Sequence, residues 1–189
     1  MMKFWRPYYP GAAIILVCCL SSCHSHNQIP PPPLTQQQVS KDLIRSHRMY
    51  IKQENDEIVQ YIKRHNYTMQ GTSTGIYYMI YRHGNGQQPV VGDYATVSYS
   101  ISLLDGTLCY DSKKDGPKRF RVGEDIEESG VHQAVEMMHT GDEGLFIIPS
   151  NLAQGLVGDR DKIPPGAVVI YDIHLLAVSK PGVAKQKTK

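Results

Sequence analysis

Nucleophilic and metal-binding side chains occur in this chain without the neighbours that their chemistry needs. Cys109 lies in a β-rich run with no motif to activate its thiol, which is typical of a half-buried structural cysteine. His132 and His139 are seven residues apart, which is not a metal-ligand spacing. His83 and His174 lie in other segments, and no glycine-rich phosphate loop follows a strand pattern. The sequence therefore gives no support to nucleophilic, metal-dependent or phosphate-binding chemistry.

The most distinctive pattern is a loop rich in proline and glycine between two apolar runs. Residues 148–155 read Ile-Pro-Ser-Asn-Leu-Ala-Gln-Gly, and residues 162–167 read Lys-Ile-Pro-Pro-Gly-Ala. Proline cannot donate a hydrogen bond to a strand ladder, so each proline marks the edge of an apolar run. The pattern predicts a tight loop between two strands.

The N-terminal residues have the features of an export signal. Lys3 and Arg6 precede an apolar run over residues 11–20, which is too short to span a bilayer comfortably. Residues 20–23, Leu-Ser-Ser-Cys, resemble the bacterial lipoprotein box, in which the cysteine becomes the lipid-bearing N-terminus. We therefore expect a lipoprotein signal peptide over residues 1–22 and a lipid on Cys23. The alternative is an ordinary signal peptide that contains cysteines.

A polar, proline-rich tether is expected to follow over residues 23–38. The prolines at 30–33 hold this segment extended, and its composition cannot bury apolar area. His24 and His26 are more typical of solvated tether residues than of metal ligands. Removal of the signal takes away two basic and no acidic residues, so the formal net charge falls from +2 to 0. The charge balance therefore gives no reason to expect a nucleic-acid partner.

Residues 39–66 have the periodicity of a helix. Thr35 with Gln38, or alternatively Ser40, can supply its N-cap. The apolar stripe is thin and consists of Leu43, Ile44, Ile51, Ile58 and Ile62. This stripe either lies on the following domain or pairs with the same helix of a second molecule, which would give a homodimer through residues 39–66.

From residue 75 onward the period changes to two, which indicates strands. Residues 76–81, 95–103, 107–110, 145–148 and 168–178 are the main strand candidates, with a further short strand marked by Phe120 and Val122. Asp105-Gly106 predicts a hairpin turn. One short amphipathic helix carries Val131, Ala134, Val135 and Met138 and stops before Gly141. An antiparallel sheet with one helix on one face is an α+β architecture.

The ordered series of motifs over residues 75–179 resembles the FKBP-type peptidyl-prolyl isomerase family. It consists of Val97-Ser98-Tyr99, Tyr110-Asp111-Ser112, Phe120-Arg121-Val122-Gly123, the helix from Gly130 to Met138, and the segments 149–155 and 163–172. Within the family, residues 149–166 look most like lipoproteins associated with gliding motility. The resemblance implies an antiparallel twisted sheet wrapped on one short helix, preceded here by a separate N-terminal helix. The expected organisation is therefore a signal at 1–22, a tether at 23–38, a helical segment at 39–70, an FKBP-like domain at 71–180 and a basic, disordered tail at 181–189.

The chemistry implied by this resemblance is rotation about an X-Pro bond. The barrier is about 18–20 kcal/mol because amide resonance is lost at the twisted midpoint. A pocket that holds the proline ring and excludes water can favour the twisted, less polar amide over the planar one. This needs apolar walls and a few hydrogen-bond donors, and no cofactor or metal.

The resemblance assigns the site residue by residue. The catalytic walls fall on Tyr99, Tyr110, Ile163 and Tyr171, and Asp111 matches an acid that links to the Tyr99 hydroxyl at the pocket rim. The substrate-binding positions fall on Phe120, Glu128, Val131 and Gln154.

The sequence departs from the family pattern in four respects. Where the family has a large apolar residue at the pocket floor, this chain has Val131, and where the family has an aromatic residue, this chain has Lys118. Where the family has an apolar pair just before the helix, this chain has Glu127-Glu128. The family uses mainly a backbone N–H there, which Glu128 still carries. The family's tyrosine that holds the bound peptide is replaced here by Gln154, whose amide can still donate a hydrogen bond. These departures predict weak catalysis or a changed substrate preference.

The sequence as a whole predicts a lipid-anchored peptidyl-prolyl isomerase that assists the folding of exported proteins. We expect it in the bacterial envelope, on the outer membrane and facing the periplasm, with proline-containing polypeptides as substrates. The main alternative is a catalytically degenerate module that binds an extended peptide or partner, with Glu127 and Glu128 selecting basic sequences. A structural envelope component with a relic pocket is a third interpretation.

Substitution of the lipoprotein-box cysteine tests the anchor. Cys23→Ser should release the protein from membranes and abolish its labelling with palmitate, because the sulfur to which lipid is attached is gone. Membrane fractionation and fatty-acid labelling measure this, and an unchanged membrane partition would exclude the anchor.

Overall fold

The computed structural model describes residues 35–182. The expected signal peptide, Cys23, most of the tether and the last seven residues of the tail lie outside the described residues. The chain divides into two units, residues 1–41 and 42–189, and only the start of the first helix represents the first unit. All contacts with the sheet domain discussed below lie within the second unit. No helix within residues 35–182 has the length and apolar character needed to cross a membrane.

Helix α1 spans Gln36–Arg64, close to the predicted range of 39–66. Its start confirms the capping pair expected from the sequence. The Thr35 Oγ1 accepts from the Gln38 backbone N–H at 3.3 Å, and the Gln38 side chain accepts from the Thr35 N–H at 2.9 Å. The helix ends before Asn66, which has a positive φ of 53°.

Within residues 35–182 the sheet contains seven strands, and every pairing among them is antiparallel. Six strands follow the order β1-β2-β6-β7-β3-β4, and β5 pairs with β3. The strands are β1 (Gln70–Gly71), β2 (Tyr77–Arg82), β3 (Tyr94–Leu103), β4 (Leu108–Asp111), β5 (Lys118–Arg121), β6 (Glu143–Ile148) and β7 (Val169–Ser179). The short helices are α2 (Ser112–Asp115), α3 (Ser129–Glu136) and the 3₁₀ turn η1 (Ser150–Leu152). The predicted α+β architecture is confirmed.

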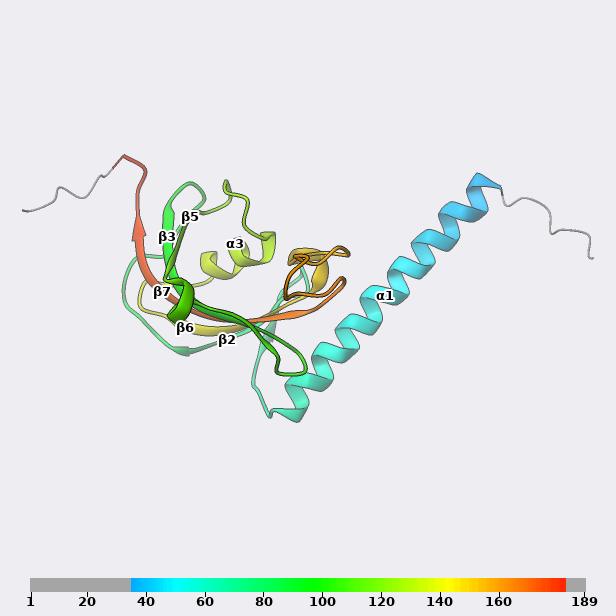
Figure 1. Cartoon of the computed structure of the whole chain (residues 1–189), viewed down its shortest axis with the longest axis horizontal. Helices are drawn as coiled ribbons and strands as arrows, with labels where there is room; N and C mark the ends of the chain where they lie inside the picture. The colour runs from blue at the N-terminus through cyan, green and yellow to red at the C-terminus, as the bar shows by residue number, and fades with distance from the viewer. Residues whose placement is uncertain (1–34, 183–189) are drawn as a thin grey trace, which may run out of the picture. The chain divides into compact units, whose positions relative to one another are not determined.

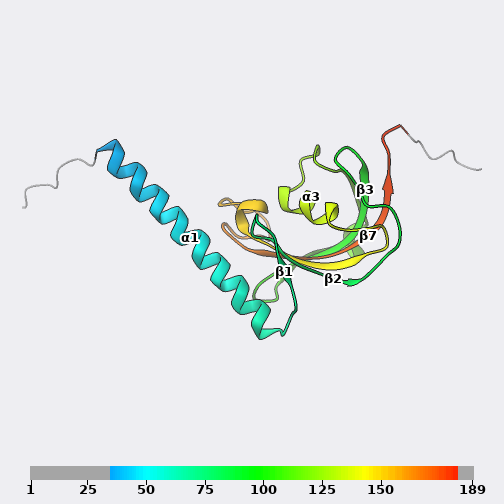
Figure 2. The same cartoon turned by 180° about the vertical axis from the view of Figure 1, so that it is seen from behind.

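One face of the sheet curves around α3 (Figures 1 and 2). The apolar residues predicted for the inner face of this helix, Val131, Ala134, Val135 and Met138, are all buried. Alternate residues of the long strands meet them, including Phe146, Ile148, Val169 and Ile173. Burial of this face is the main source of stability because apolar area removed from water contributes about 25 cal/mol per Å².

The opposite face of the sheet packs against the C-terminal half of α1. Ile58 and Tyr61 of α1 form a second cluster with Ile147, Val168 and Ile170. Ile147 and Ile170 are adjacent in sequence to residues that face α3, such as Ile148 and Val169. Because side chains alternate along a strand, each strand presents one apolar set to each face of the sheet. The docking interpretation of α1 therefore holds for this half of the helix. Leu43 and Ile44 remain 64% and 59% exposed.

Candidate functional site

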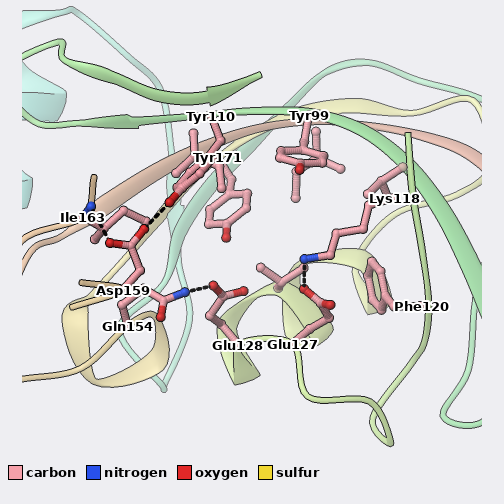
Figure 3. Close-up of a pocket in the computed structure, with 14 residues that line it drawn as sticks. Tyr99, Tyr110, Lys118, Phe120, Glu127, Glu128, Gln154, Asp159, Ile163 and Tyr171 are labelled. Carbon is pink, nitrogen blue, oxygen red and sulfur yellow. Dashed lines mark hydrogen bonds and ion pairs between the residues drawn. The ribbon is translucent and has the colours of Figure 1, made fainter. Parts of the chain in front are cut away.

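An apolar pocket of about 230 Å³ opens between the sheet, α3 and the loop that follows β6. Drug-sized ligands occupy pockets of about 300–1,000 Å³, so this one suits a single side-chain ring with its adjacent backbone. Its apolar lining consists of Val97, Ile101, Phe120, Val131, Ile163 and Ile173. Three tyrosines and five polar or charged residues complete it, namely Tyr99, Tyr110, Tyr171, Lys118, Glu127, Glu128, Gln154 and Asp159 (Figure 3).

Strand register brings the three tyrosines together. Ile101 of β3 is opposite Tyr110 of β4 on one side and Tyr171 of β7 on the other. Tyr99 lies two residues before Ile101 and therefore on the same face of β3. Figure 3 shows the three rings on the sheet side of the pocket, facing the start of α3.

The environment of the tyrosines is poor in water. Tyr171 is only 5% exposed, and its burial, followed by the negative charge of Glu128, raises the pKa of its hydroxyl above the usual value. Burial likewise raises the pKa of Tyr99. Both side chains therefore stay neutral at physiological pH and serve as uncharged walls with hydroxyl groups at the rim.

The tyrosine of β4 ties the sheet to the loop after β6. We call residues 150–166 the pocket loop. The Tyr110 hydroxyl donates to Asp159 of this loop at 2.5 Å, and the Lys162 ammonium lies 4.4 Å from the Tyr110 ring centre. Asp159 also accepts from the backbone N–H of Ile163, which sets that residue in the pocket wall.

The polar and charged residues that replace the expected pocket residues contact one another in two pairs. Lys118 of β5 forms an ion pair with Glu127 at 2.6 Å, and the Gln154 amide donates to the Glu128 carboxylate. Each pair joins different elements, β5 to the segment before α3 and the pocket loop to the start of α3. The two contacts therefore brace walls that apolar residues would otherwise have to hold by packing.

The floor of the pocket is formed by Phe120 and Val131, which are both buried. His132, the neighbour of Val131, is also buried. Its Nδ1 accepts from the Gly123 N–H at 2.9 Å, so Nε2 carries the proton and faces the Asp125 carbonyl oxygen at 3.2 Å. This histidine holds the 123–125 turn beside the floor.

Asp111 has a different place from the one expected by resemblance. Its carboxylate accepts from the Lys113 backbone N–H at 2.8 Å and caps α2, and the pocket lining does not include it. A residue that begins a helix is well suited to such a cap, since the first backbone N–H groups have no partner within the helix. The expected link to Tyr99 is not among the hydrogen bonds of the described residues.

Sequence reasoning placed the walls in one pocket but missed the contacts that hold them. Asp159 had no signal beyond its position in a Gly-Asp-Arg-Asp loop, and its partner Tyr110 is 49 residues away. Cys109 is buried, its thiol lies 3.5 Å from the Lys162 carbonyl oxygen, and burial raises its thiol pKa, as expected of a structural cysteine. Among residues 35–182 no cluster of histidine, cysteine and acidic residues could hold a metal ion.

The hydrogen bond between Tyr110 and Asp159, here called the clasp, predicts a contribution to stability that is lost in acid. Burial opposes ionisation of Asp159, but hydrogen bonds from Tyr110 and from the Asp161 and Ile163 backbones lower its pKa below 3.8. A depressed folded-state pKa gives stability that is present above the ordinary value and lost as pH falls through the folded value. Urea unfolding of the wild type and Asp159→Asn should therefore differ most at neutral pH and converge below about pH 3.8. A difference that stays constant with pH would contradict the clasp.

Comparison with known proteins agrees with the geometry. Residues 85–176 match the family described as FKBP-type peptidyl-prolyl cis-trans isomerase. A protein of Neisseria meningitidis named probable FKBP-type peptidyl-prolyl cis-trans isomerase FkpA is 38% identical over 117 residues, which are 61% of this chain and 42% of that protein. The outer membrane protein MIP of Legionella longbeachae is 33% identical, over 57% of this chain and 46% of that protein.

A solved structure supports the same assignment. The crystal structure of a peptidyl-prolyl cis-trans isomerase from Pseudomonas syringae pv. tomato matches with a TM-score of 0.60 and 28% identity, over 70% of this chain and 96% of that chain. The chain spans less than half the length of the two curated relatives named above. Family match, fold and pocket agree, and residues 85–176 are therefore similar to the FKBP-type peptidyl-prolyl cis-trans isomerase family.

Proposed function

We propose that this protein catalyses cis–trans isomerisation of X-Pro bonds in proline-containing polypeptides. The observation that carries the proposal is a small apolar pocket walled by Tyr99, Tyr110, Ile163 and Tyr171, within a domain that matches the isomerase family. Its size suits a proline ring, and the neutral tyrosines supply walls without charge.

Catalysis in this proposal follows from removal of water. A planar amide is more polar than the twisted one, because resonance separates charge between oxygen and nitrogen. A proline ring seated among Phe120, Val131 and Tyr171 loses the water that stabilises the planar form, so the barrier falls. No covalent intermediate is required.

A backbone donor completes the proposed mechanism. Glu128 is the N-cap residue of α3, with φ −60° and ψ 138°, so its N–H lies outside the helical ladder. We assign this N–H to the carbonyl oxygen next to the proline. Its side chain is engaged by Gln154, which is therefore a brace of the site as well as a candidate peptide contact. Asp111 contributes by fixing the end of β4, directly after Tyr110.

The decisive experiment is an isomerisation assay on residues 24–189 with proline tetrapeptides. We expect measurable acceleration, weaker than that of a family member with every pocket residue intact, since each lost contact costs about 1 kcal/mol or roughly fivefold. Asp111→Ala and Tyr171→Ala should each lower the activity further. Tyr171→Phe should largely retain it because the apolar wall remains.

Cys109→Ser, a change at a buried residue outside the pocket lining, is the matched control and should leave the activity unchanged. Complete absence of acceleration on peptides with varied residues before proline would refute the enzyme proposal.

A peptide-binding module is the second candidate function. Three carboxylates, those of Glu127, Glu128 and Asp159, line the pocket together with the single ammonium of Lys118. This excess of negative charge favours extended peptides with basic residues beside the proline. Retained peptide affinity in a chain without isomerase activity would establish this function, and restoring activity with Val131→Trp and Gln154→Tyr would show which residues had removed it.

We propose an envelope location with a lipid anchor at Cys23, facing the periplasm from the outer membrane. The support is the export signal and the lipoprotein box in the sequence, together with a Legionella longbeachae relative that is named an outer membrane protein. In that location the clients are exported proteins that fold slowly because of proline isomerisation. The residues at 149–166 further suggest kinship with gliding-motility lipoproteins.

We also propose that the chain forms a homodimer through α1. Ile44 and Ile51 are exposed and seven residues apart, which is the spacing of one seam position in a coiled-coil heptad, and the exposed Leu43 precedes Ile44. Sedimentation of non-lipidated protein with and without residues 24–70 should show a dimer only for the longer form. A monomer in both forms would exclude this proposal.

A further inference from the structure

The pocket loop is held from behind by helix α1. This loop begins at η1 and ends at Gly166, and it places Gln154, Asp159 and Ile163 in the pocket wall. Its front side is fixed by Tyr110 and Glu128. Two residues of α1, one helical turn apart, contact the two ends of the loop, and neither residue is in the pocket lining.

The first contact is made by a buried carboxylate. Glu54 is only 6% exposed, and its Oε1 accepts from the backbone N–H of Ser150 at 2.7 Å. Ser150 opens η1, whose N-cap residue is Pro149 and has no side-chain cap of its own. Glu54 therefore supplies the missing cap from 96 residues away in sequence.

The second contact is made by Tyr50. Its hydroxyl donates to the Gly166 carbonyl oxygen at 3.0 Å and lies 3.2 Å from the Ser150 hydroxyl. A Cβ at Gly166 would lie 2.6 Å from this tyrosine oxygen, and Gly166 has a φ of +69°. Glycine is thus required at the end of the loop both by backbone conformation and by the close approach of α1.

The two ends of the loop are also joined to each other. The Gly155 N–H donates to the Ser150 carbonyl at 2.7 Å, and the Gly166 N–H donates to the Gly155 carbonyl at 2.9 Å. Gly155 directly follows Gln154, so a shift at Ser150 or Gly166 is passed to the pocket wall through two hydrogen bonds. Within residues 35–182 this is a continuous route from α1 to the site.

We propose that Tyr50 and Glu54 are positioning residues of the isomerase site, and that docking of α1 sets the place of the pocket loop. This inference rests on the proposed function for its catalytic consequence. Neither residue is in the pocket lining, so they act through Ser150 and Gly166.

Amide hydrogen exchange and kcat/KM on residues 24–189 test the proposal together. Glu54→Ala should speed exchange at Ser150, Gly155 and Gly166 by about tenfold while the β3–β7 amides keep their rates, because opening is local. It should lower kcat/KM about threefold to tenfold through a loosened pocket wall. Tyr50→Phe should act in the same direction, and Glu54→Gln should restore both readouts because the amide oxygen still accepts.

Asn55→Ala is the matched control, since Asn55 bonds the Tyr77 hydroxyl from the same helix at 3.0 Å without contacting the loop. It should leave loop exchange and kcat/KM unchanged. The proposal is overturned if Glu54→Ala leaves loop exchange unchanged, if it speeds exchange equally throughout the sheet, or if loop exchange rises with no change in kcat/KM. A wild-type chain with no activity defeats the proposed function, and exchange alone then decides whether α1 fixes the loop.

Discussion

The antiparallel pairing of β3 with β7 is the contact on which the site depends. It runs from Tyr94 opposite Ser179 to Leu103 opposite Val169, with one irregularity after Thr96. Because side chains alternate between faces, this register places Tyr99, Ile101 and Tyr171 on the pocket side at once. A slip of one residue would turn the pocket walls toward the opposite face. The buried apolar residues on both faces of the sheet fix that register, so the stability of the fold and the geometry of the pocket have the same cause.

The polar residues around the pocket make sense as pairs. Taken singly, Lys118, Glu127, Glu128 and Gln154 look like losses from an apolar pocket. In the structure, however, Lys118 pairs with Glu127 and Gln154 with Glu128. A buried or half-buried charge is costly alone and tolerable with a partner, so each change is offset by its neighbour in space. The pocket keeps an apolar floor inside a rim of hydrogen bonds, in which Tyr110 and Asp159 form a third pair.

Local patterns predicted most of the fold, whereas the positions of the pocket walls came from the resemblance to the FKBP family. The alternation over residues 95–103, the Asp105-Gly106 turn and the spacing of Val131, Ala134, Val135 and Met138 correspond to β3, a hairpin and α3. The contacts between distant segments had no local signal, as with Glu54 and Ser150. The role of Asp111 could not be predicted from the sequence either. A carboxylate that caps a helix and one that contacts the pocket rim look alike in sequence, and in the structure Asp111 caps α2.

A double-mutant cycle at Gln154 and Glu128 tests most directly whether the rim residues act as pairs that hold an isomerase pocket. The measurement is kcat/KM for a proline tetrapeptide with Gln154→Ala, Glu128→Ala and the double variant, all of which keep the Glu128 backbone N–H. If the two side chains act only on each other, each single change lowers kcat/KM about fivefold and the double change lowers it no further. Losses that multiply would show independent roles, and a wild-type chain without acceleration would contradict the account altogether.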